Sequence, residues 1–118
     1  MGKVLVMLRK APYGTVYAAE AIRAIMGLVS FEVEVEVLFI HDGVFVAKKD
    51  QNPEAIDMKS LGAVLPQLKD MDIEKFYACE QSLKERNLTA DDLTVEVELC
   101  TPDNFENKLS EFDHILPF

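Results

Sequence analysis

Stretches typical of buried strands alternate with stretches typical of helices along the whole chain. Residues 3–8, KVLVML, form a short apolar run of the kind found in a strand buried on both faces. A loop with Pro12 and Gly14 follows, and Thr15 is placed as a helix N-cap. The next apolar residues recur at helical spacing: Ala18, Ile22, Ile25 and Val29.

This alternation continues to the end of the sequence. Further strands are predicted at residues 31–40, 73–78, 93–100 and 114–118, and helices at residues 52–68, 80–87 and 101–112. Parallel strands need long crossover connections, which helices supply. The sequence therefore predicts an α/β fold with a mainly parallel five-stranded sheet that helices cover on both faces.

Two of the predicted strands, residues 31–40 and 93–100, alternate Glu with Val. That pattern is typical of strands with one wet face, so we expect them nearer the edges of the sheet. In the helix at residues 52–68, Pro66 is expected to cause a kink, because proline lacks the backbone N–H that a helix interior needs. Residues 41–43, HDG, predict a turn that leads into an irregular stretch.

The length of 118 residues suits one domain, residues 1–118, and 49% apolar residues suffice for a single core. Acidic residues outnumber basic ones by 21 to 12, which gives a formal charge of -9. Such a surface repels phosphate backbones and anionic lipids, so direct nucleic-acid and membrane partners are not expected. The N-terminus lacks a secretory pattern, and no apolar run has the length of a membrane span. We therefore expect a cytoplasmic protein whose cysteines stay reduced.

The sequence contains no recognisable cofactor motif. Gly14 stands alone in the first loop, so neither the GxGxxG fingerprint nor the phosphate-binding P-loop is present. A phosphoacceptor domain needs clustered carboxylates for magnesium, whereas Asp42 stands alone after the second strand. The two histidines do not pair with either cysteine at the spacing of zinc ligands. Neither a nucleotide nor a metal is expected.

Cys79 stands where a predicted strand gives way to a predicted helix, in the stretch KFYACEQSLKERNL. In an open parallel sheet, ligands bind beyond the carboxyl ends of the strands. A thiol there faces helix N–H groups that stabilise the thiolate, and Lys75 and Lys84 could add positive potential. The charge of Glu80 opposes these effects. Cys79 is therefore either a reactive thiol or a small buried hydrophobe.

The loops at the same predicted edge carry further candidate site residues. They follow the first and second strands: Tyr13, Gly14, Thr15, His41, Asp42 and Gly43. His41 could transfer a proton near neutral pH, or the HDG segment could be a polar turn chosen for its geometry. Cys100 ends the fourth predicted strand, where core packing is the simpler interpretation.

Four stretches together resemble a known family. They are APYGT after the first strand, FIHDGVF around the second turn, FYACEQSLKERNL at the third junction and the C-terminal DHILPF. In this order they resemble the DsrE/DsrF family of small sulfur-relay proteins, which includes the TusB, TusC and TusD subunits of tRNA thiolation. The resemblance is closest to the DsrF/TusC type and covers essentially the whole chain.

The resemblance implies a DsrE-like three-layer α/β/α fold and assembly into trimers or hexamers, or into hetero-oligomers with homologous subunits. It also implies sulfur carried as a persulfide on the cysteine after the third strand, a position that Cys79 matches. Protein thiols and persulfides would then be the donors and acceptors, without a cofactor. Such a protein is a carrier, similar to a transferase rather than to a classical enzyme.

Two functional hypotheses follow. In the first, Cys79 relays sulfane sulfur, and the loop residues named above, together with Glu80, shape its surroundings. In the second, the chain is a non-catalytic subunit of a DsrEFH-like or TusBCD-like complex, in which exposed apolar residues such as Phe45, Val46 and Phe118 matter more than the thiol. A small-molecule binding domain is a third possibility, which would require a deep pocket with few reactive groups.

Overall fold

The computed structural model describes residues 3–13, 16–49, 64–71, 73, 75–101 and 103–118. Its five strands form one sheet in the order β4-β3-β2-β1-β5, and every neighbouring pair is parallel. The strands are β1 (Val4–Leu8), β2 (Val35–Phe39), β3 (Phe76–Cys79), β4 (Glu98–Cys100) and β5 (His114–Pro117). This sheet confirms the predicted α/β fold.

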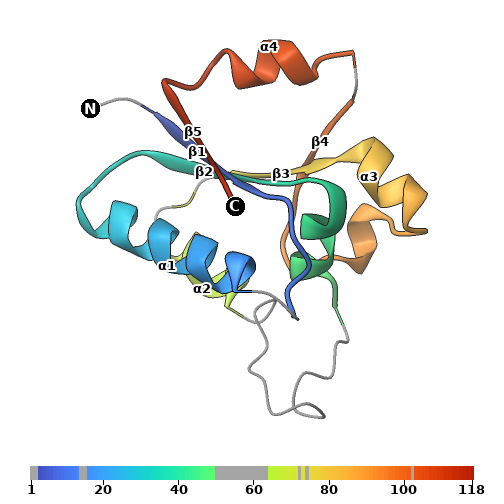
Figure 1. Cartoon of the computed structure of the whole chain (residues 1–118), viewed down its shortest axis with the longest axis horizontal. Helices are drawn as coiled ribbons and strands as arrows, with labels where there is room; N and C mark the ends of the chain where they lie inside the picture. The colour runs from blue at the N-terminus through green and yellow to red at the C-terminus, as the bar shows by residue number, and fades with distance from the viewer. Residues whose placement is uncertain (1–2, 14–15, 50–63, 72, 74, 102) are drawn as a thin grey trace.

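Helices cover both faces of the sheet. Helices α1 (Tyr17–Ser30) and α2 (Leu65–Lys69) lie on one face, and α4 (Phe105–Leu109) crosses the other (Figure 1). Helix α3 (Glu80–Glu85) follows β3 directly. Two short 3-10 helices complete the described elements, η1 (His41–Ala47) and η3 (Ala90–Asp92). Within the described part of the chain, no helix has the length and apolar character that crossing a membrane requires.

The period-two alternation of each strand divides the core into two clusters. The larger cluster lies under α1 and α2 and includes Val6, Val37 and Phe39. The smaller cluster lies under α4 and includes Leu5, Leu38, Tyr77 and Cys100. Residues i and i+2 of a strand share a face, which is why neighbouring strand residues such as Val37 and Leu38 enter opposite clusters.

Helix α1 forms where the spacing of apolar residues predicts it. Ala18, Ile22 and Ile25 are buried against the sheet and Val29 is half-buried. The predicted cap, Thr15, lies outside the described residues. The chain then reverses through Glu32, which has a positive φ of 61°.

The structure describes only the last part of the helix that is predicted at residues 52–68. Residues 50–63 lie outside the described part of the chain, and α2 begins only at Leu65. Pro66 therefore sits in the first turn, where a helix needs no N–H from it, and the expected kink at this residue is wrong.

The HDG segment and the residues that follow it form a regular element, where the sequence predicts a turn and an irregular stretch. Residues 41–47 form η1, which turns back against the end of the sheet and buries Val44 and Val46 completely. Phe45 and Phe118 are only half-exposed and pack against the larger core cluster. The prediction of an exposed side chain is therefore wrong for Val46, whereas Phe45 and Phe118 are partly buried because they pack against the core.

The Glu and Val alternation predicts the position of one strand and not of the other. Strand β4 is an edge strand with Glu98 exposed, as expected. Strand β2, however, is the central strand, and Glu36 is only 4% exposed. The Glu36 carboxylate is satisfied because the Tyr77 hydroxyl donates a hydrogen bond to it and Lys3 Nζ lies 2.7 Å from its Oε2 atom. Burial, and next the hydrogen bond to Glu36, raise the pKa of Tyr77.

Candidate functional site

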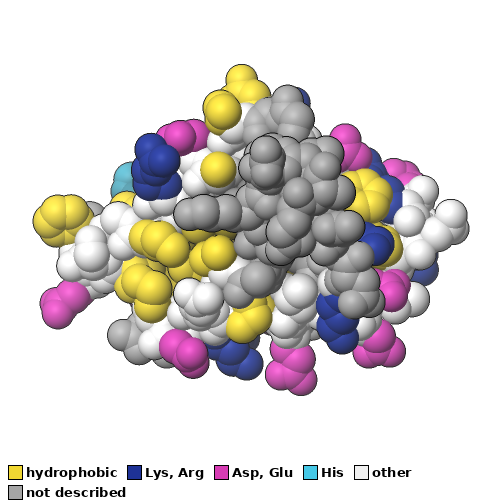
Figure 2. Space-filling view, turned by 90° about the horizontal axis from the view of Figure 1, so that it is seen from below, with side chains coloured by type: hydrophobic (Ala, Val, Ile, Leu, Met, Phe, Trp, Pro, Cys, Tyr) yellow, Lys and Arg dark blue, Asp and Glu magenta, His cyan; other side chains and the backbone are white. Residues whose placement is uncertain are grey.

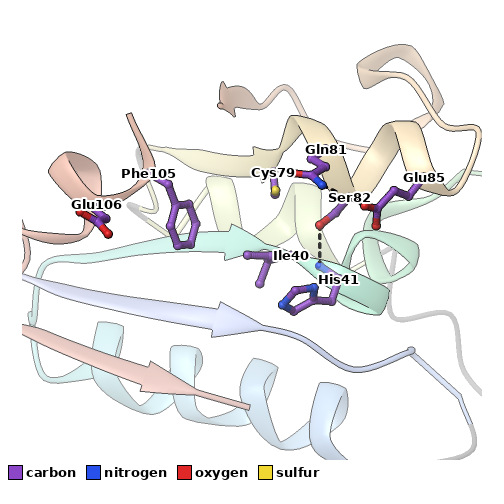
Figure 3. Close-up of a pocket in the computed structure, with 8 residues that line it drawn as sticks. All are labelled: Ile40, His41, Cys79, Gln81, Ser82, Glu85, Phe105 and Glu106. Carbon is purple, nitrogen blue, oxygen red and sulfur yellow. Dashed lines mark hydrogen bonds between the residues drawn. The ribbon is translucent and has the colours of Figure 1, made fainter. Parts of the chain in front are cut away.

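A pocket of about 340 Å³ opens at the carboxyl ends of β2 and β3 (Figure 3). Three segments supply its described walls, namely the end of β2 with the start of η1, the junction between β3 and α3, and α4. The lining residues are Ile40, His41, Cys79, Gln81, Ser82, Glu85, Phe105 and Glu106. The edge of the sheet where open α/β folds bind ligands is thus the edge that carries this pocket.

Cys79 lies at the junction that the sequence predicts. It is the last residue of β3 and the N-cap of α3, with extended backbone angles of φ -72° and ψ 117°. Its side chain makes no capping hydrogen bond, its residue is half-exposed, and its thiol is free. Figure 3 shows the sulfur atom among the pocket residues. A reactant that enters the pocket can therefore reach Cys79.

Of the two lysines expected to add positive potential at Cys79, only Lys84 lies close to it, and Lys84 is paired with Glu80. Lys84 Nζ lies 2.9 Å from Glu80 Oε1, one helical turn back, so the two charges next to the thiol offset each other. Lys75 lies at the opposite end of β3, where its Nζ atom is 3.6 Å from Glu98 Oε2. The expectation that Lys75 adds positive potential at the thiol is therefore wrong.

His41 and Ser82 join two walls of the pocket. The backbone N–H of His41 donates to Ser82 Oγ at 2.9 Å, and Ser82 is buried although it is polar. His41 has a positive φ of 53°, which its hydrogen bond and the following 3-10 helix hold in place. This bond fixes the end of β2 against α3 and so keeps His41 and Cys79 on the same pocket.

Asp42 and Gly43 position η1 and are not among the described lining residues. The Nε and Nη2 atoms of Arg86 each lie 3.0 Å from Asp42 Oδ1, and Arg86 Nη1 donates to the carbonyl oxygen of Ser82 at 3.1 Å. Gly43 is buried, and a Cβ atom built on it would lie 1.8 Å from the carbonyl oxygen of Leu8. Only glycine lets η1 approach the end of β1 this closely.

The remaining predicted residues either do not line the pocket or lie outside the described part of the chain. Tyr13 is half-exposed in the loop after β1, and Glu80 is half-exposed next to Cys79. Neither belongs to the described lining residues. Gly14 and Thr15 lie outside the described part of the chain, so their predicted roles at the site stay predictions.

Several lining residues were not identified from the sequence. Gln81, Ser82 and Glu85 follow Cys79 within one short helix, and the spacing from 82 to 85 puts two of them on one face. Phe105 lies on α4, and its contact with the site depends on where α4 crosses the sheet. Among the described residues, no three His, Cys, Asp or Glu side chains are grouped as metal ligands would be.

Residues 2–118 match the family described as DsrE/DsrF-like, and the chain belongs to this family. The intracellular sulfur oxidation protein DsrF of Allochromatium vinosum is 36% identical to it, over 94% of this chain and 83% of that protein. Protein TusC of Klebsiella pneumoniae is 34% identical, with 100% of both chains covered. Among solved structures, the YchN protein of E. coli has a TM-score of 0.85 at 20% identity, with 100% of both chains covered, and so supports the fold alone.

Proposed function

We propose that this protein is a sulfur-relay protein that accepts sulfane sulfur as a persulfide on Cys79 and passes it to another thiol. The observation that carries the proposal is that Cys79, a half-buried residue with a free thiol, lines a pocket at the carboxyl edge of the sheet. Membership of the DsrE/DsrF-like family supports it, as do relatives named for intracellular sulfur oxidation and as TusC. The relay would operate in the cytoplasm, where thiols stay reduced.

The chemistry requires only thiols and persulfides. The Cys79 thiolate attacks the outer sulfur of a donor persulfide, a new bond forms between these two sulfur atoms, and the donor leaves as a thiolate. Cys79 then holds the persulfide until the thiolate of an acceptor attacks its outer sulfur and Cys79 leaves as the thiolate. The reaction is a transfer between sulfur atoms and needs no cofactor.

The pocket walls suit this exchange. Ile40 and Phe105 are apolar, so the approach to Cys79 is partly shielded from water. Glu85 and Glu106 add carboxylates at the wall, which favour partner proteins whose reactive cysteine is flanked by basic residues. Gln81 Nε2 is held by a 3.0 Å hydrogen bond to Glu85 Oε1, which fixes both side chains on α3.

A second candidate function is that of a structural subunit that assembles with copies of itself, as a trimer or hexamer, or with homologous chains. Figure 2 shows hydrophobic side chains gathered on the part of the surface that lies over α1. The large exposed apolar residues on α1 and at its two ends are Val16, Tyr17, Met26 and Phe31. Exposed aromatic residues of this kind suit a protein interface.

Intact-mass measurement after a short incubation with cysteine persulfide tests the first candidate. The wild type and Cys100→Ser should each gain the mass of one sulfur atom, and Cys79→Ser should gain none. If the wild type takes up no sulfur while a known carrier protein does, the relay proposal is wrong. The second candidate function, that of a structural subunit, then gains support if the wild type forms an oligomer and Phe31→Asp lowers its molar mass, measured in solution by light scattering.

A further inference from the structure

Cys79 and Cys100 are direct neighbours on adjacent strands. They are register partners in the parallel pair β3 and β4, at the carboxyl ends of both strands. Both side chains point to the sheet face that α4 covers, and both contribute to the smaller core cluster. Adjacent strands lie about 4.7–4.9 Å apart. This spacing falls within the Cα separation of about 4.4–6.8 Å that disulfide bonds span.

The two thiols have different surroundings. Cys79 is half-exposed and lines the pocket, whereas Cys100 is only 3% exposed. Cys100 packs under α4 in the smaller core cluster, with Tyr77 and Phe105, and the space between these side chains is too small for a water molecule. Burial raises the pKa of the Cys100 thiol, and the opposing effect of Lys108 is smaller. External thiols therefore meet Cys79 first, while Cys100 is within reach of Cys79 and shielded from the solution.

We propose that Cys100 is a resolving thiol, which discharges the Cys79 persulfide when no acceptor takes its sulfur. This inference rests on the proposed function. The sulfur of Cys100 attacks the Sγ atom of Cys79, the inner sulfur of the persulfide, and the proton of the Cys100 thiol passes to the outer sulfur of the persulfide anion as that sulfur leaves. The bond between the inner and outer sulfur breaks, hydrosulfide leaves with the electron pair, and a Cys79–Cys100 disulfide forms.

The step balances without an external oxidant. The sulfane sulfur is reduced to hydrosulfide while the two thiols are oxidised to a disulfide. Because Cys100 is buried and mainly protonated, the internal attack is slow compared with transfer to an acceptor in the pocket. The disulfide form cannot accept sulfur again until a dithiol reductant opens it. The pair thus limits how long an unused persulfide persists.

The experiment follows the loaded protein over time after the persulfide donor has been removed. In the wild type, the species with one extra sulfur should decay, and a species two hydrogen atoms lighter than the dithiol form should appear with one equivalent of hydrosulfide. Cys100→Ser should accept sulfur on Cys79 and retain it at least about tenfold longer, because the resolving thiol is missing. Cys100→Ala repeats the comparison without a hydroxyl in the apolar site.

The outcomes separate this inference from the proposed function. If neither the wild type nor the Cys100 variants load, both are wrong. If all of them load and lose sulfur at equal rates, or if peptide mapping finds the extra sulfur on Cys100 instead of a disulfide, the relay stands and the resolving role is wrong. Circular dichroism of each variant verifies that it is folded before loading.

Discussion

Lys3 Nζ lies 2.7 Å from Oε2 of Glu36. Glu36 lies on the central strand β2, and its carboxylate is buried on the face of the sheet that α4 covers. The Lys3 side chain is about a third exposed, whereas that of Glu36 is almost fully buried. The Tyr77 hydroxyl binds the other carboxylate oxygen. A charge can remain inside this sheet because two partners satisfy it.

The first prediction concerns the removal of this cation. Lys3→Met keeps most of the alkyl chain but leaves the buried Glu36 carboxylate without its ion pair. We expect the free energy of unfolding to fall by about 1–3 kcal/mol, measured by urea titration at neutral pH. Lys75→Met is the matched control, because its pair with Glu98 is 3.6 Å long and exposed on both sides. The control should change stability by less than about 1 kcal/mol, and equal losses in both variants would contradict the account.

The same ion pair predicts a dependence on pH. The hydrogen bond to Glu36 is the largest cause that raises the pKa of Lys3 above its ordinary value of 10.5. A raised pKa stabilises the folded state below the unfolded pKa, and this contribution is lost as the pH rises through the folded pKa. The difference in unfolding free energy between the wild type and Lys3→Met should therefore narrow above about pH 10.5. A difference that stays constant up to about pH 11.5 would show that the Lys3 charge is not responsible.

Two glycines should respond in opposite ways to the same substitution. Gly43→Ala would bring a Cβ atom within 1.8 Å of the Leu8 carbonyl oxygen, so η1 or β1 must move, and we expect a loss of more than about 2 kcal/mol. Gly27 lies inside α1 with nothing within 4 Å of a Cβ atom. Gly27→Ala should raise stability by about 0.5–1 kcal/mol, because alanine favours the helix. Thermal unfolding of both variants measures these changes. A Gly43→Ala variant as stable as the wild type would contradict the close contact between Gly43 and Leu8.

The two cysteines should differ in their reaction with a small alkylating agent. In the folded protein, iodoacetamide should modify Cys79 at least about tenfold faster than Cys100, because Cys100 is buried and its pKa is raised. Peptide mass spectrometry at successive times measures both rates. In concentrated urea the difference should disappear. Equal rates in the folded state would mean that α4 does not shield Cys100.

Much of the fold follows from local patterns in the sequence. The apolar run of β1 and the helical spacing of Ala18, Ile22 and Ile25 predict their elements because burial imposes periods of 2 and 3.6. The position of Cys79 at a strand-to-helix junction follows from the same reasoning. Local patterns also explain the error at Glu36, since an alternating strand indicates a wet face unless distant residues satisfy its carboxylates.

Local sequence patterns do not predict contacts between segments that lie far apart in the sequence. The pairing of Cys79 with Cys100 depends on strand order and register, which neither strand encodes by itself. The contact of Asp42 with Arg86 joins residues 44 positions apart. Phe105 reaches the pocket only because of the path that α4 takes across the sheet. The composition of the site thus depends on tertiary packing, whereas its location at the sheet edge follows from the topology.

The transfer of radioactive sulfane sulfur through the protein tests the central claim most directly. The wild type would be loaded briefly from a labelled persulfide donor, separated from it and mixed at once with reduced glutathione. The relay account predicts that peptide mapping finds the label on Cys79 before mixing, that glutathione carries it afterwards, and that Cys79→Ser never takes it up. No label on the wild type, or equal labelling of Cys79→Ser, would contradict the account.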